Sequence, residues 1–180
     1  MKNQNEILVK ELYEKYPYPN RGFETQKESL RYVTWVSKIF GKDINYWKGK
    51  TVLELGCGTG ELANGLSACG ANIIAIDLSK NSISKANLLK KKLKNKNVTF
   101  ENKNILTYNN TKKFDIVIAL GSLHHTIDAR GGFSIASKHV KKDGLVIIGL
   151  YNKYSRFRHR LKRIILFIMI MFLLKRKKNI

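Results

Sequence analysis

The sequence contains little cysteine, little proline and few acidic residues. Cys57 and Cys69 are its two cysteines, and their spacing fits neither a metal-binding motif nor a disulfide framework. We therefore expect no metal site, and a reducing, cytoplasmic compartment. The N-terminal stretch MKNQNEILVKELYEKYPYPN also lacks the long apolar run of a secretory signal peptide, which favours the same location.

The shortage of acidic residues makes the chain strongly basic. Lys and Arg number 34 against 13 Asp and Glu, which gives a net charge of +21. Such a charge attracts phosphate-rich partners or anionic surfaces. A general bias toward Lys, Asn and Ile, as in NKNVTF and ENKNILTYNN, would explain the same charge without any such partner, and both explanations stay open. Nucleic acid is not expected as a partner, because charge alone supports it.

The two prolines separate two helical patterns near the N-terminus. Apolar residues recur at helical spacing before Pro17 and again in residues 30–39, so residues 1–49 are expected to form an N-terminal helical and lid segment. A chain of 180 residues that is 43% apolar suits one α/β domain with attachments. Residues 50–152 are expected to be that domain, and residues 153–180 a basic, apolar, basic tail.

Short apolar runs alternate with amphipathic stretches through the middle of the chain. Each run has strand length and is rich in Val and Ile, and continuous apolarity suits strands that are buried on both faces of a parallel sheet. The alternation predicts a doubly wound, mostly parallel α/β sheet. Before the last run we expect a helix and then a turn at residues 142–144. The five runs are TVLEL, NIIAIDL, NVTF, FDIVIAL and GLVIIGL.

A glycine-rich segment follows the first expected strand. It reads Glu54-Leu55-Gly56-Cys57-Gly58-Thr59-Gly60, and a helix is expected directly after it. Glycines at such a turn let the backbone bend sharply and approach a ligand closely. A nicotinamide-binding fingerprint would need glycine where the sequence has Glu61, so that class of cofactor is disfavoured. A plain strand-to-helix turn is the alternative interpretation of this segment taken alone.

An acidic residue ends the second expected strand. A carboxylate at Asp77 can accept hydrogen bonds from both hydroxyls of a ribose. A helix cap is the alternative role for Asp77. However, Ser79 is itself a good N-cap, which leaves Asp77 freer to bind a ligand.

Two histidines follow the fourth expected strand, in the segment Gly121-Ser122-Leu123-His124-His125-Thr126. Histidine has an unperturbed pKa of about 6.5 and can take a proton from an O–H or N–H group at neutral pH. His124 or His125 is therefore a candidate general base. A structural role, in which the ring holds the loop through bonds to backbone, is the alternative for each of them.

In this order, the motifs resemble those of class I S-adenosylmethionine-dependent methyltransferases, over about residues 10–160. The resemblance implies a Rossmann-like fold, S-adenosylmethionine as cofactor, and a glycine loop along its methionyl part with Glu54 near its ammonium group. The family usually has Asp at the position of Asn104, whose amide oxygen can still accept a bond from the adenine amino group. The cofactor-binding positions that the resemblance implies are Glu54, Gly56, Cys57, Gly58, Gly60, Asp77, Leu78, Asn104, Ile105 and Gly121.

The function implied is transfer of a methyl group to an O or N acceptor on a substrate that the sequence does not identify. The Pro-Pro-aromatic motif typical of amino methylation on nucleic-acid bases is absent, and no Cys follows the fourth strand for cytosine C5 chemistry. The family normally continues past the fifth strand into a helix and a β-hairpin, whereas about thirty residues follow here. A truncated or degenerate S-adenosylmethionine-binding regulatory module, attached to a membrane surface, is therefore the alternative. An oligomer or partner that covers the shortened sheet edge also stays open.

Three tyrosines precede the first expected strand. Tyr13, Tyr16 and Tyr18 lie on a segment that is broken by Pro17 and Pro19. We expect this segment to fold over the cofactor cleft as a lid that excludes water. Packing against the edge of the sheet is the alternative.

The C-terminal tail holds an unbroken apolar run, residues 164–174, between two basic clusters. Its eleven residues fall short of the roughly 20 that a helix needs to cross a bilayer, so we do not expect it to span. A helix with no polar face must bury itself in the domain, in another subunit or in a membrane interface. We expect burial of its first half and contact of its second half with an anionic membrane.

Overall fold

The computed structural model describes residues 2–16, 25–151 and 157–177. The chain forms two compact units, Met1–Leu150 and Tyr151–Ile180. The first unit contains the sheet, and the second contains helix α6, Phe157–Lys177. The boundaries expected at residues 49 and 152 stay predictions.

Among the described residues, two helices and a short 3-10 helix precede the sheet. They are α1, Lys2–Lys15, α2, Gln26–Ile39, and η1, Ile44–Trp47. Helix α2 begins at a capping box, in which the Thr25 side chain accepts from the Glu28 amide and the Glu28 carboxylate accepts from the Thr25 amide. The two prolines expected to separate the helices lie outside the described residues.

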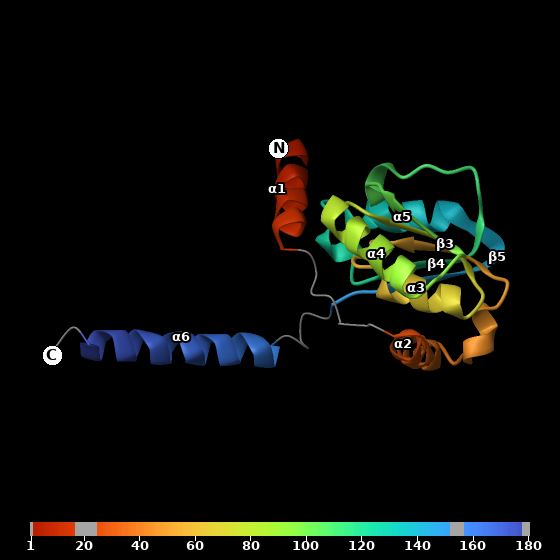
Figure 1. Cartoon of the computed structure of the whole chain (residues 1–180). Coiled ribbons are helices and arrows are strands. Elements are labelled where there is room, and N and C mark those ends of the chain that lie inside the picture. The colour runs from red at the N-terminus through yellow and green to blue at the C-terminus, as the bar shows by residue number, and fades with distance from the viewer. Residues whose placement is uncertain (1, 17–24, 152–156, 178–180) are drawn as a thin grey trace. The chain divides into compact units, whose positions relative to one another are not determined.

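The five apolar runs form one parallel sheet, as the sequence predicts. Its strands lie in the order β3-β2-β1-β4-β5, so the direction of winding reverses between β1 and β4. Figure 1 labels β3, β4 and β5 of this sheet together with the neighbouring helices α3, α4 and α5. This doubly wound order confirms the predicted fold class. The strands are β1 Thr51–Leu55, β2 Asn72–Asp77, β3 Val98–Asn102, β4 Phe114–Leu120 and β5 Val140–Gly149.

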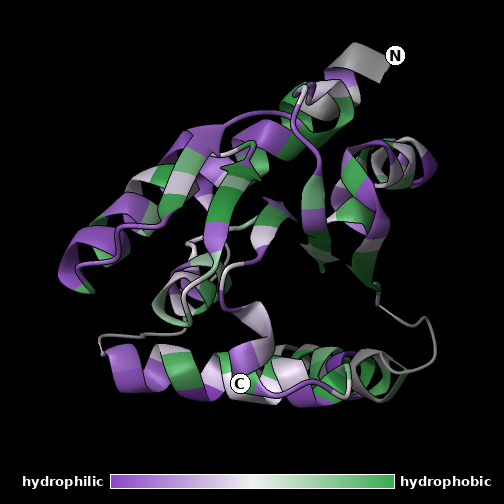
Figure 2. Ribbon diagram, turned by 90° about the vertical axis from the view of Figure 1, so that its right-hand side faces the viewer, coloured by the Kyte–Doolittle hydropathy of each residue, from purple (hydrophilic) through white to green (hydrophobic). Residues whose placement is uncertain are grey.

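Helices cover both faces of the sheet. Successive residues of a strand point to opposite faces, so Val52 belongs to one apolar core and Leu53 to the other. The first core includes residues of α2, α3 and α4, and the second includes residues of α5 and of the strands. Figure 2 shows hydrophobic residues, in green, on the strands and on the helices beside them. The covering helices and short 3-10 turns are α3 Glu61–Ala68, α4 Lys80–Lys92, η2 Ile105–Thr107, η3 Leu123–His125 and α5 Ala129–His139.

The turn expected at residues 142–144 is wrong as a separate element. Strand β5 begins at Val140, directly after α5, and residues 141–144 lie inside it as a register shift opposite β4. Gly144 makes this possible, because a Cβ there would lie 2.8 Å from the carbonyl oxygen of Asp115. The bulge absorbs the residues that a turn would have used.

Helix α6 belongs to a unit of its own. Within this unit each of its described side chains is exposed, and the burial expected for the first half of the apolar run stays a prediction. Within the described part of the chain, no helix is both long and apolar enough to cross a membrane. No strand follows β5 among the described residues, which leaves β3 and β5 as the two edges of the sheet.

Candidate functional site

The loops that carry the predicted site residues meet at one edge of the sheet. All five strands are parallel, so the loops after β1, β2, β3 and β4 leave from the same end. Strand β1 lies between β2 and β4, where the winding reverses. In open α/β sheets, ligands bind at the carboxyl ends of the strands at this reversal.

The glycine loop is packed at its two ends and open in its middle. A Cβ on Gly56 would lie 2.4 Å from the Ser122 Cβ, and one on Gly60 would lie 2.6 Å from the Ala86 Cβ, so neither position has room for a side chain. Gly58, at a φ of +54°, has nothing within 4 Å of its Cβ direction. A ligand can therefore approach the backbone at Gly58.

Asp77 ties this loop to the start of α4. Its Oδ2 accepts a 2.9 Å bond from the Gly58 amide, and its Oδ1 accepts a 2.9 Å bond from the Ser79 amide. Ser79 caps α4 as predicted, with its hydroxyl accepting from the Ser82 amide. The two bonds to Asp77 nevertheless leave its carboxylate less available to a ligand than the sequence suggested. The Leu78 amide also bonds to this carboxylate, whose two oxygens have about four acceptor sites, so Asp77 can still accept from a ribose hydroxyl.

The Glu54 side chain lies buried behind the glycine loop. It is 5% exposed, and its Oε2 has no hydrogen-bond partner. Burial raises the pKa of Glu54 to about 8, and the negative charges of Glu61 and Asp77 add to this, against a backbone bond from Ala63. An unsatisfied buried carboxylate beside an open backbone loop is suited to a cationic group.

Cys57 is a packing residue of the loop. It is buried, and its thiol donates to the Gly58 carbonyl at a sulfur–oxygen distance of 3.7 Å. Burial raises the pKa of the Cys57 thiol well above its usual value, and the charges of Glu54 and Asp77 raise it further. Thiolate chemistry at this position is therefore disfavoured.

Three further cofactor-binding positions that the resemblance implies follow β2 and β3. Ile105 is buried, with its Cδ1 3.6 Å from the Cβ direction of Gly56. Leu78 is half-buried, and its carbonyl accepts from the Asn102 side chain. The Asn104 side-chain oxygen accepts from the Leu106 amide at 2.9 Å, so an adenine amino group would have to share that oxygen.

The two candidate bases lie on η3, after β4. The Ser122 hydroxyl donates to the Leu55 carbonyl at 2.6 Å, and the Gly121 amide donates to the Gly149 carbonyl, so the loop is fixed to β1 and β5. The rings of His124 and His125 are half-buried, with centroids 4.1 Å apart. In the part of the chain that the structure describes, no group of three or more His, Cys, Asp or Glu is placed to hold a metal ion.

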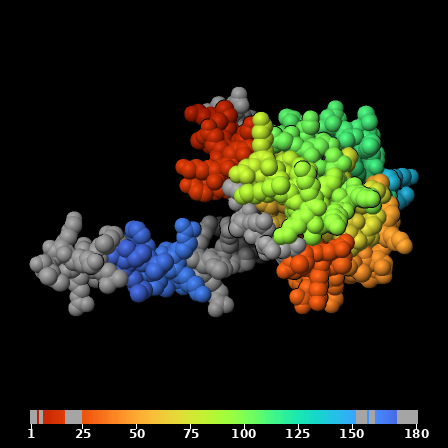
Figure 3. Space-filling model, viewed as in Figure 1, coloured from red at the N-terminus to blue at the C-terminus, as the bar shows by residue number. Residues whose placement is uncertain are grey.

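The end of α1 adds two contacts that bridge β2 and β4. The Tyr13 ring lies edge-on to His125, with centroids 5.9 Å apart. The Glu14 carboxylate accepts from the Lys80 and Asn81 amides at 2.6 and 3.1 Å, at the start of α4, and Figure 3 shows α1 in red beside α4 in yellow-green. Partial desolvation opposes ionisation of Glu14, but the bonds from Lys80 and Asn81 lower its pKa.

The structure brings only part of the expected lid to this edge. Tyr13 is half-buried there, whereas Tyr16 is 62% exposed and Tyr18 lies outside the described residues. Glu14 was not identified from the sequence, because its partners lie 66 and 67 positions away and no local pattern links them.

The fold and this site together define a domain of the class I, S-adenosylmethionine-dependent methyltransferase type. A methyltransferase domain model matches residues 47–165, which is more than half of the chain, and the chain belongs to this family. The match confirms the resemblance found in the sequence.

Curated relatives agree with this assignment. The chain is 31% identical to the ubiquinone biosynthesis O-methyltransferase of Pelagibacter ubique (strain HTCC1062), over 59% of this chain and 44% of that protein. It is 28% identical to a putative methyltransferase of Geobacillus sp. (strain WCH70), over 79% of this chain and 59% of that protein. The chain spans about half the length of the curated relatives that it matches.

Solved structures show the same fold. The magnesium protoporphyrin IX methyltransferase of Synechocystis PCC 6803, solved with bound SAM, matches with a TM-score of 0.59 at 18% identity, over 76% of this chain and 72% of that one. An N-methyltransferase of Bradyrhizobium japonicum WM9, in complex with S-adenosyl-L-homocysteine, also gives 0.59 at 16% identity, over 80% and 71% of the two chains.

Proposed function

We propose that this chain binds S-adenosylmethionine at the carboxyl edge of the sheet and transfers its methyl group to an O or N acceptor. The observation that carries this proposal is the unsatisfied, buried carboxylate of Glu54 beside the open backbone at Gly58. The adjacent strand ends in Asp77, whose carboxylate can accept from a ribose hydroxyl besides its bonds from backbone amides. The names of the curated relatives favour oxygen as the acceptor atom.

The residues present fit each part of this cofactor. Glu54 would neutralise the ammonium group, the backbone at Gly58 would lie along the methionyl chain, and Asp77 would hold the ribose. Ile105 and Leu78 would pack against the adenine, with Asn104 beside it, and Gly121 would contact the cofactor from the end of β4. When bound, the cofactor supplies an electrophilic methyl group on a sulfonium. The protein contributes positioning and exclusion of water.

A base is needed where the acceptor is an O–H or an N–H group. We assign this role to His124 or His125, because both rings lie on η3 at the end of β4 and histidine titrates near neutral pH. The ring of Tyr13 against His125 limits the orientations open to that imidazole.

Calorimetry and methyl transfer test the function. We expect full-length protein to bind S-adenosylmethionine and its demethylated product in the micromolar range, as sites of this kind commonly do. Labelled methyl groups should then pass from the cofactor to a molecule in a cell extract. Binding without transfer would support the regulatory-module alternative instead. Heat with a nicotinamide dinucleotide and none with either methyl cofactor would overturn the assignment.

The end of α1 is proposed as a lid over the cleft. Tyr13 touches His125 and Glu14 caps α4, so one turn of α1 bridges the loops on both sides of the glycine loop. We expect Tyr13→Ala to lower methyl transfer several-fold by admitting water. Tyr16→Ala is the matched control, because Tyr16 is 62% exposed and takes no part in the contacts with His125, Lys80 and Asn81. Equal activity of the two variants would contradict a lid.

We also propose a reducing, cytoplasmic location with contact at a membrane surface. Cys57 and Cys69 are both free thiols, which suits a reducing compartment. The membrane contact rests on the basic residues and the apolar run of the C-terminal unit.

A further inference from the structure

The C-terminal unit combines strong positive charge with exposed apolar surface. Residues 151–180 contain ten Lys and Arg and no Asp or Glu, so nearly half of the net charge of +21 lies in a sixth of the chain. Helix α6 occupies most of this unit. Its basic residues stand at both ends of the apolar run, in HRLKR before it and KRKK after it.

The apolar run of α6 is apolar on every side of the helix. Residues 164–170 are seven consecutive apolar residues, and successive side chains on a helix are 100° apart, so they point in every direction around the axis. Their side chains are 45–65% exposed. A contiguous apolar patch of this kind marks an interaction site.

The length of the run excludes one mode of membrane binding. Eleven apolar residues at 1.5 Å each make about 16 Å, roughly half of a hydrocarbon core of about 30 Å. A helix that crossed the bilayer would therefore draw one basic cluster into the hydrocarbon. With the helix parallel to the surface, both clusters stay at the headgroups of one leaflet.

The two basic clusters indicate what kind of partner binds α6. A second copy of this chain carries the same basic clusters at both ends of its run, so pairing in either direction brings like charges together. An anionic bilayer provides hydrocarbon for the run and negative headgroups for both clusters. We propose that α6 docks the chain onto an anionic membrane, parallel to its surface. This proposal stands independently of the methyltransferase activity.

Sedimentation of the full-length protein with vesicles tests the docking. We expect most of the protein to pellet with vesicles of phosphatidylglycerol and phosphatidylcholine at low salt, and roughly tenfold less with phosphatidylcholine alone. High salt should release the fraction of the protein that is bound through electrostatic attraction to the headgroups, because salt screens that attraction. Protein that stays in the supernatant with anionic vesicles, or pellets equally with both kinds, would overturn the proposal.

Matched substitutions distinguish docking by α6 from nonspecific binding of a basic protein to the vesicles. Leu166→Asp should reduce pelleting at least about tenfold, because it places a charge in the apolar run. Leu88→Asp on α4 is the control, since Leu88 is 63% exposed and Leu166 57% exposed. Equal loss in both variants would contradict docking by α6.

A second pair of variants tests the basic cluster. Lys162→Gln with Arg163→Gln removes two charges from α6, and Lys91→Gln with Lys92→Gln removes two from the exposed side of α4. Only the first should weaken pelleting and its salt dependence. Size-exclusion chromatography distinguishes the rival occupant: a dimer that Leu166→Asp dissociates, without vesicle binding, would assign α6 to a second copy.

Discussion

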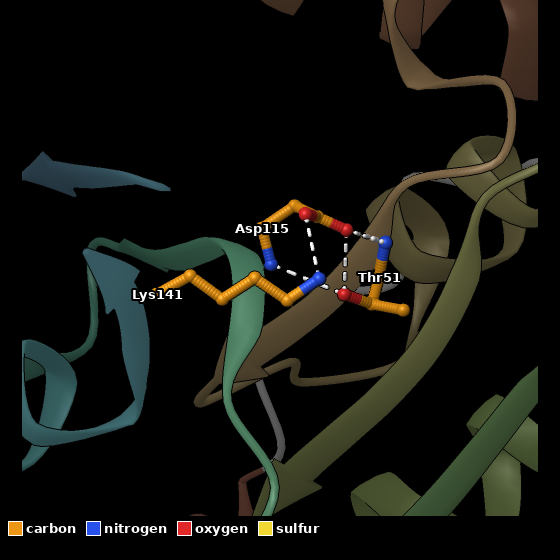
Figure 4. Close-up of polar contacts among 3 residues, drawn as sticks. All are labelled: Thr51, Asp115 and Lys141. Carbon is orange, nitrogen blue, oxygen red and sulfur yellow. Dashed lines mark hydrogen bonds and ion pairs between the residues drawn. The ribbon is translucent and has the colours of Figure 1, made fainter. Parts of the chain in front are cut away.

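Two carboxylates on neighbouring strands, Glu54 on β1 and Asp115 on β4, meet opposite environments at the two ends of the sheet. Asp115 lies at the amino end, where its Oδ2 accepts from the Thr51 amide at 2.8 Å and the Thr51 hydroxyl at 2.7 Å (Figure 4). Its Oδ1 accepts from Lys141 at 2.8 Å. Glu54, at the carboxyl end, has an Oε2 without any partner.

This difference distinguishes a carboxylate that stabilises the sheet, Asp115, from one that is placed to bind a ligand, Glu54. Bonds from Lys141 and Thr51 hold the pKa of Asp115 well below its usual value, so this carboxylate joins β1, β4 and β5. Burial raises the pKa of Glu54 to about 8 instead. A folded protein keeps a buried, unsatisfied group only where something else compensates for its cost, and a bound cation would do so here. The carboxyl end is therefore built for a ligand, and the amino end for stability.

The largest effect is expected at Asp77. Asp77→Ala removes both ribose acceptors and the support of the Gly58 amide, so affinity for S-adenosylmethionine should fall at least about 100-fold. Asp77→Asn keeps an acceptor for that amide and serves if the Ala variant unfolds. Calorimetry is the measurement, with Asp115→Asn as the control from the other end of the sheet. If the control also lost affinity, the division between the two ends would fail.

Glu54→Gln should lower affinity roughly 30-fold, because a neutral amide cannot neutralise an ammonium group. Glu54 holds a proton near neutral pH, and its ion pair requires the ionised form, so binding should release about one proton per cofactor. Calorimetry in buffers of different ionisation heat measures that proton. The variant should release none, and release that persists in it would assign the proton to another group such as Asp77, whose pKa is also raised by burial.

Glu54 also links folding to pH. Its folded pKa of about 8 lies above the ordinary value of 4.5, so its stabilising contribution is complete below about pH 4.5 and is lost as pH rises through 8. Relative to wild type, Glu54→Gln should therefore gain thermal stability from pH 5 to pH 9. A constant difference between the two proteins across that range would contradict the raised pKa.

The same contrast recurs within the glycine loop. Gly60→Ala places a methyl group against Ala86 and Phe100 and should cost about 2 kcal/mol of unfolding free energy. Gly58→Ala meets open space and should cost about 1 kcal/mol through its left-handed φ alone. Denaturant unfolding measures both. Of the two variants, Gly58→Ala should nevertheless lose more cofactor affinity relative to its loss of stability. The reason is that its methyl group points where the ligand would lie.

The structural features that could be predicted from the sequence are those that local sequence patterns indicate. The strand runs, the glycine loop and the Ser79 cap each depend on residues a few positions apart, and the structure has them where the patterns indicate. The contacts of Glu14 and Asp115 were not predictable, because their partners lie 66 and 64 positions away. Packing in three dimensions selects such pairs, and one sequence carries no signal for them.

Bonds from backbone amides to the candidate site residues were also not predictable. The Asn104 oxygen, which we expect to accept from an adenine amino group, also accepts from the Leu106 amide. Asp77 was expected to be freer to bind a ligand because Ser79 can cap α4, yet it accepts from the Ser79 amide as well. Side chains at strand ends tend to satisfy exposed backbone amides first. Role assignments from residue type alone therefore overestimate how much of a group is left for a ligand.

The smallest effect is expected at the amino end of the sheet. Asp115→Asn weakens the Lys141 pair and the Thr51 bonds, and it should cost about 1 kcal/mol of unfolding free energy at pH 7, since both side chains of the ion pair are partly exposed to solvent. The folded pKa of Asp115 is depressed, so its contribution is complete above the unfolded pKa of about 3.9 and is lost as pH falls. Wild type and variant should therefore differ in thermal stability at pH 7 and converge below pH 3. Asp143→Asn, at an exposed carboxylate of β5, is the control and should change little. A difference between wild type and Asp115→Asn that stayed constant down to pH 2 would show that the cost comes from packing rather than from charge.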